Sequence, residues 1–205
     1  MKEIRLERTL RKIGFRDFEI VDENNELEEE LYNLELKYII DILPFRLQIE
    51  KEQFYEEALQ DEIPRTSFND LENFYCKKEQ DRLLQKKWIS IILKFSYYFK
   101  LKNIYLHGLG VCRDKDIQKL YDDRGFSLRY RPIHVMNQLE RFISFGRKEL
   151  KRSSFVFEFE NQVEIHMFCD ELFMGVYSKD KKEIEPNMVK ILEMLVQSEG
   201  LFLHE

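Results

Sequence analysis

Two alternating runs near the C-terminus constrain the fold more than any other feature of the sequence. Phenylalanine occupies every second position from 155 to 159, and a second apolar series does the same from 163 to 167. Because successive side chains of a strand point to opposite faces, each run predicts a strand with one apolar face. Asn161 and Gln162 separate the two runs and suit a turn. The pattern therefore predicts a β-hairpin.

The residues after the hairpin predict one more strand and a final helix. Residues 172–177 have the composition of a third antiparallel strand. Pro186 suits the first turn of a helix, where its missing N–H is not needed, and Gly200 suits the position after the last turn. We therefore expect a β-meander followed by a closing helix that covers one face of the sheet.

Helical spacing dominates the first two thirds of the sequence. Apolar residues recur every three or four positions in residues 26–43, 67–102 and 135–145, which predicts three amphipathic helices. The combined pattern predicts an α+β fold, in which a helix-rich N-terminal two thirds packs against a C-terminal antiparallel β-meander with a closing helix.

Length and composition indicate an ordinary globular protein. The chain has 205 residues, of which 43% are hydrophobic, and this is enough to bury one sizeable core. Only 7 glycines and 4 prolines argue against a disordered, collagen-like or low-complexity chain. We expect a single domain over residues 1–205. The charge pattern also allows an acidic helical subdomain over residues 1–66 beside an α+β portion over residues 67–205.

Two further features suggest a cytoplasmic protein. The sequence has no unbroken apolar stretch long enough for a signal peptide or a membrane span. Its three cysteines are odd in number and widely spaced, which suits free thiols in a reducing compartment better than a disulfide framework. We therefore expect a cytoplasmic location and no membrane partner.

Charge is distributed unevenly along the chain, although the net charge is only −6. Residues 16–63 contain 16 acidic and 4 basic residues, whereas residues 77–152 contain 19 basic and 8 acidic residues. Such segments either neutralise each other across an internal interface or present their charges to another macromolecule. The sequence leaves both interpretations open.

Presentation of the acidic segment to solvent predicts a non-catalytic, intracellular protein-interaction module. An acidic inhibitor or immunity-type protein works in this way, because its carboxylates attract a basic partner protein and a few buried anchors supply the affinity. The candidate partner-binding residues are Glu28, Glu29, Glu30, Glu56, Glu57 and Asp61. This function requires no cofactor, no metal and no catalytic residue, and the sequence does not indicate an oligomeric state.

The alternative function is action on nucleic acid. Basic side chains neutralise phosphates, and the candidates are Arg129, Arg131, Arg141, Arg147, Lys148 and Arg152. A second form of this hypothesis is a metal-dependent nuclease that uses an acidic cluster on the hairpin, formed by Glu158, Glu160, Glu164 and His166. The match to nucleases of the restriction type is incomplete, because the triplet Glu164-Ile165-His166 does not end in a lysine.

Overall fold

The structure is a computed structural model of the whole chain. It describes residues 8, 11, 16–22, 34–41, 78–107, 126–136, 139–140, 143, 154–168, 173–179 and 182–205.

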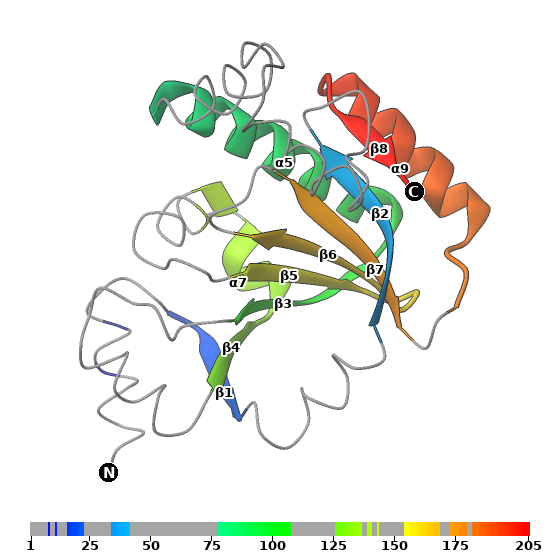
Figure 1. Cartoon of the computed structure of the whole chain (residues 1–205). Coiled ribbons are helices and arrows are strands. Elements are labelled where there is room, and N and C mark those ends of the chain that lie inside the picture. Colours follow the sequence, from blue (N-terminus) through cyan, green and yellow to red (C-terminus); the bar gives the residue numbers. More distant parts are fainter. Residues whose placement is uncertain are drawn as a thin grey trace, which may run out of the picture.

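The centre of the molecule is one antiparallel sheet of eight strands (Figure 1). Its strands are β1 (Phe18–Asp22), β2 (Leu34–Asp41), β3 (Leu101–His107), β4 (Phe126–Tyr130), β5 (Ser154–Phe159), β6 (Val163–Phe168), β7 (Met174–Lys179) and β8 (Phe202–His204). They are arranged in the order β1-β4-β3-β5-β6-β7-β2-β8, so that β1 and β8 form the two edges. Strands distant in sequence are therefore neighbours in the sheet, above all β2 and β7.

Two long helices belong to the described part of the chain, α5 (Lys78–Tyr98) and α9 (Pro186–Ser198), together with the single turn α7 (Pro132–Val135). Figure 1 shows α5 and α9 on the same side of the sheet. Their apolar side chains and one face of the sheet form a single buried cluster, in which Phe95 of α5 meets Phe159 of β5 with ring centroids 4.9 Å apart. This cluster is the hydrophobic core.

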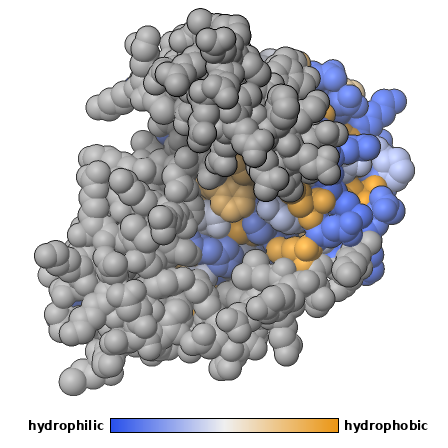
Figure 2. All heavy atoms as spheres, in the orientation of Figure 1, coloured by the Kyte–Doolittle hydropathy of each residue, from blue (hydrophilic) through white to orange (hydrophobic). Residues whose placement is uncertain are grey.

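The space-filling view in Figure 2 shows the outside of the same molecule. The described residues visible on its right, in the region of α9, are mostly hydrophilic with apolar side chains set among them. This is the ordinary surface of an amphipathic helix, since Met188, Leu192 and Val196 of α9 point into the core. None of the helices within the described ranges is both long and apolar enough to cross a bilayer.

The predicted fold class is wrong for the N-terminal two thirds. That part of the chain is not rich in helices, because it contributes β1, β2, β3 and β4 to the sheet. The clearest error is the helix predicted over residues 26–43, of which residues 34–41 form β2. β2 pairs with β7 on one side and β8 on the other, and Ile40 near its C-terminal end is fully buried. Pairing with two distant strands has overridden the local helical spacing.

The C-terminal elements lie close to their predicted positions. The hairpin of β5 and β6 turns at residues 160–162, where Gln162 has a positive φ of 61°. The third strand begins two residues later than expected, and the closing helix begins at Pro186. α5 occupies part of the helix predicted over residues 67–102, while residues 67–77 lie outside the described ranges. Whether residues 1–66 behave as a subdomain stays a prediction.

Candidate functional site: the polar face of the sheet

The two faces of the sheet differ sharply in composition. The face toward α5 and α9 is apolar, whereas the opposite face carries polar side chains that the strand register aligns in rows. One row consists of Glu19, Arg129, Tyr105, Val156, His166 and Gly175, in which only Val156 and Gly175 are not polar. The next row consists of Asn103, Glu158, Glu164 and Tyr177. We call this surface the polar face. Because it lies opposite the core, its polar groups must be satisfied by one another or by solvent.

An ion-pair network, buried at Glu164 and partly buried at Glu158 and Lys179, occupies the middle of the polar face. Glu158 and Glu164 are directly opposite each other on β5 and β6, and Lys179 lies near both, with its Nζ 3.4 Å from Glu158 Oε1 and 3.1 Å from Glu164 Oε1. Asn103 Nδ2 donates a hydrogen bond to Glu158 at 2.7 Å, and the Tyr105 hydroxyl lies 3.3 Å from the same carboxylate. The lysine and the amide therefore offset the repulsion between the two carboxylates.

His166 extends this network toward β7. Its Nε2 is 2.8 Å from Glu164 Oε2, and both side chains are buried. Burial by itself would raise the pKa of Glu164, but the hydrogen bonds and positive charges of His166 and Lys179 outweigh burial, so this pKa is lowered. The Tyr177 ring packs on the imidazole with a centroid distance of 4.3 Å. The ring also covers Gly175, where a Cβ atom would lie only 2.5 Å from Tyr177 Cε2.

A second histidine lies on β3 near the same cluster. His107 Nδ1 is 2.5 Å from the Oγ of the fully buried Ser127, and the ring stacks on Tyr105 with centroids 5.5 Å apart. Burial, with a further contribution from His166, lowers the pKa of His107 to about 4. The imidazole is therefore neutral near pH 7. Burial also raises the pKa of Tyr105 to about 12, and the Glu158 charge acts in the same direction.

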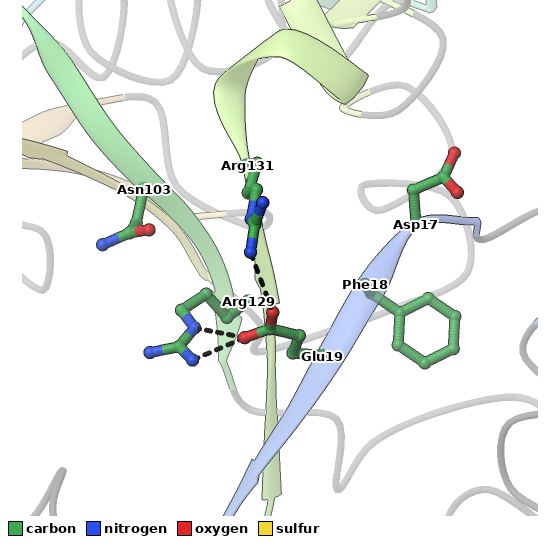
Figure 3. A pocket seen from close by; sticks show the side chains of 6 residues that line it. All are labelled: Asp17, Phe18, Glu19, Asn103, Arg129 and Arg131. Carbon is green, nitrogen blue, oxygen red and sulfur yellow. Dashed lines mark hydrogen bonds and ion pairs between the residues drawn. The ribbon is translucent and has the colours of Figure 1, made fainter.

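At the β1 end the polar face opens into a cavity of about 390 Å³. Its lining consists of Asp17, Phe18, Glu19, Asn103, Arg129 and Arg131 (Figure 3). Arg129 donates to Glu19 Oε2 from Nε at 3.0 Å and from Nη2 at 2.5 Å, whereas Arg131 Nη2 is 3.8 Å from Glu19 Oε1. The hydrogen bond and charge of Arg129 lower the pKa of Glu19. Asn103, bonded to Glu158, joins this cavity to the ion-pair network.

The structure brings together three of the four residues proposed for the acidic cluster. Glu158, Glu164 and His166 share the polar face, whereas Glu160 lies in the turn after β5 and pairs with Lys100 at 2.6 Å. Of the proposed nucleic-acid-binding residues, Arg129 and Arg131 line the cavity. Arg141, Arg147, Lys148 and Arg152 lie outside the described residues. So do all six proposed partner-binding residues, Glu28, Glu29, Glu30, Glu56, Glu57 and Asp61.

The described carboxylates of the polar face are not arranged as metal ligands. The two central carboxylates already accept from Lys179, His166 and Asn103. Within the part of the chain that the structure describes, no three side chains of His, Cys, Asp or Glu converge as metal ligands. The geometry suits a polar network in which the described side chains fix one another.

Sequence reasoning missed four of the residues on the polar face, three on β3 and one on β7. Asn103, Tyr105 and His107 occupy every second position of β3, and this polar alternation opposite Ile104 and Leu106 is a readable strand signal. Lys179 leaves no comparable signal, because its role depends on β7 lying beside β6.

No protein-family model, no curated protein and no solved structure matches the chain. Function is therefore inferred from the residues themselves.

Proposed function

We propose that the protein is a non-catalytic interaction module of the acidic inhibitor or immunity type, whose acidic segment recognises a basic partner protein. The competing interpretation is that the acidic segment, residues 16–63, neutralises the basic segment, residues 77–152, inside the molecule. The two interpretations differ in which carboxylates pair with the cations of that basic segment.

The ion pairs of the basic segment carry the proposal. Lys94 pairs with Glu199 at 2.5 Å, Lys100 with Glu160 at 2.6 Å, and Arg82 with Glu140 at 3.8 Å, while Arg129 and Arg131 share Glu19. The carboxylates of Glu140, Glu160 and Glu199 lie outside the acidic segment, residues 16–63, whereas Glu19 lies inside it. Among the described residues, Lys94, Lys100 and Arg82 therefore have counter-charges outside the acidic segment, and this supports a role for its remaining carboxylates toward another molecule.

The polar face lends no support to catalysis as the main activity. Glu158 and Glu164 both pair with Lys179, and Glu164 also bonds to His166, so these side chains already have partners within the protein. The nuclease hypothesis needs carboxylates that can bind Mg²⁺. Here the ammonium group of Lys179 already pairs with both Glu158 and Glu164. Arg129 and Arg131, from the nucleic-acid hypothesis, share their cavity with Asp17 and Glu19, so its lining has no net positive charge, whereas a polyanion such as nucleic acid is bound by a net positive surface.

Charge would act mainly on the rate of association. A concentrated negative surface attracts a basic partner from a distance, raises the association rate by about 10- to 1,000-fold, and loses this advantage at high salt. Close packing of apolar side chains at the interface would then determine the lifetime of the complex.

The test compares acidic residues inside and outside the segment. One variant carries Gln at Glu28, Glu29 and Glu30, and the matched control carries Gln at Glu183, Glu185 and Glu193, so that both lose three carboxylates. A partner captured by cross-linking to the full chain is identified and purified, and its association rate is measured at low and high salt.

We expect a basic partner whose association at low salt is at least about tenfold slower with the acidic-segment variant and unchanged with the control. An acidic partner, or equal rates for the two variants, would contradict the proposed function.

A further inference from the structure

The cavity at the β1 end of the polar face has the size and shape of a small-molecule site. Its volume of about 390 Å³ falls within the range of roughly 300 to 1,000 Å³ that is usual for ligand pockets. Four of its lining residues, Phe18, Glu19, Asn103 and Arg129, belong to the adjacent strands β1, β3 and β4, and Asp17 and Arg131 directly flank β1 and β4. A rigid frame of this kind presents its side chains in a fixed geometry.

Arg129 is oriented before any ligand arrives. Two of its N–H groups bond to Glu19, and the Tyr105 hydroxyl also accepts a hydrogen bond from its guanidinium. Fixing the rotamer of a long side chain costs conformational entropy. An arginine that is already held in place therefore loses less entropy when it binds a ligand. Asn103 is fixed in the same way by its hydrogen bond to Glu158.

The guanidinium group of Arg131 is less strongly engaged with Glu19 than that of Arg129. Its side chain is 74% exposed, and its distance of 3.8 Å from Glu19 is longer than a hydrogen bond. Figure 3 shows Arg129 and Arg131 pointing toward the Glu19 carboxylate, with Asp17 and Phe18 directed away from it. Two guanidinium groups thus approach one point of the cavity, Arg129 from β4 and Arg131 from the position directly after β4. Guanidinium groups bind carboxylate and phosphate oxygens with matching planar geometry.

We propose that this cavity binds a small molecule through an oxyanion group, a carboxylate or a phosphate, held by Arg131 and Arg129 beside the Asn103 amide. The four charged residues of the lining, Asp17, Glu19, Arg129 and Arg131, balance in sign, which favours a ligand with a single anionic group over a polyanion such as a nucleic acid. This site includes none of the six candidate partner-binding residues, so it is independent of the proposed protein partner.

The chain offers a close control for Arg131. Arg82 of α5 is 71% exposed, and its guanidinium also lies 3.8 Å from a single carboxylate, that of Glu140. Arg131→Gln and Arg82→Gln therefore remove the same charge from nearly the same degree of exposure. Only the first change alters the cavity.

The experiment titrates the full chain with inorganic phosphate and separately with acetate, by calorimetry at constant ionic strength set with chloride. We expect saturable binding of at least one anion at one site. Arg131→Gln should raise the dissociation constant by about tenfold or more, as expected when hydrogen bonds to a charged group are lost. Arg82→Gln should leave the dissociation constant unchanged. Stronger binding of phosphate would indicate a phosphorylated ligand, and stronger binding of acetate a carboxylate.

Amide and guanidinium NMR signals show where the anion binds. Saturation should shift the Asn103 side-chain amide and the Arg129 Nε–H signals. The proposal is overturned if neither anion binds saturably, if both substitutions weaken binding equally, or if binding leaves these two signals unmoved.

Discussion

At the residue scale, Gly175 determines how the polar face packs. A methyl group at this position would lie 2.5 Å from Tyr177 Cε2, so the ring would have to leave its place over the backbone and against His166. Because a tyrosine side chain can swing aside, we expect Gly175→Ala to lower the free energy of unfolding by about 1 to 2 kcal/mol. Urea denaturation measures this change.

A double-mutant cycle checks the cause. If the clash with the ring is responsible, Gly175→Ala should be nearly harmless in a Tyr177→Ala background. An equal loss in both backgrounds would mean that the ring is not what excludes the methyl group.

His107 should make stability dependent on pH. Its pKa is about 4 in the folded protein against about 6.5 in the unfolded chain, so between these values the unfolded state binds a proton that the native state does not. Stability therefore falls as the pH drops from about 6.5 to about 4, by about 3 kcal/mol in total, and the effect is absent above this range. Urea unfolding at a series of pH values measures the slope.

His107→Asn separates this effect from the acid titration of Glu164, because only the histidine is changed. The variant should show a flatter dependence of stability on pH over that interval. Ring signals of His107 that titrate near its ordinary pKa in the native protein would refute the prediction.

At the element scale, two substitutions in α9 test whether this helix packs on the core through its apolar face. Leu192 is 2% exposed in the core, whereas Met194, two residues later on the same helix, is 58% exposed. Leu192→Ala should destabilise the protein by about 2 to 5 kcal/mol through the cavity it leaves, and Met194→Ala by less than about 0.5 kcal/mol. Thermal or urea unfolding compares them, and similar losses would show that α9 does not pack through this face.

The elements also show where sequence reasoning succeeds and where it fails. The β5–β6 hairpin is local, so alternation and a two-residue break were sufficient to place it. In β2, Leu34 and Tyr38 are four residues apart, and this spacing fits a helix as well as a strand. Only pairing with β7, some 140 residues away in the chain, decides between them, and no local pattern records that contact.

The same distinction holds for the candidate site. Glu158, Glu164 and His166 could be placed on one face because they belong to one hairpin. Their neutralisation by Lys179 and their link through Asn103 to Arg129 and Glu19 depend on the strand order. The sequence thus predicts the carboxylates of the network but not the partners that change their chemistry.

At the scale of the whole molecule, the sheet should unfold as one cooperative unit that includes the N-terminal segment. β1 and β2 both belong to residues 1–66, yet β1 forms an edge next to β4, and β2 lies between β7 and β8. Opening β2 alone would separate β8 from the sheet and expose Ile40, which is fully buried. Strands joined in this way lose their contacts together.

Native-state hydrogen exchange in increasing urea tests this cooperativity. The amides of Ile39 and Ile40 in β2 should exchange with the same opening free energy as those of Ile165 in β6, since both require global unfolding. If residues 1–66 instead form a separate subdomain, β2 amides would exchange through a smaller opening that leaves β6 protected. Equal protection would mean that the acidic segment is anchored at both ends of the sheet, with β1 at one edge and β2 next to the other.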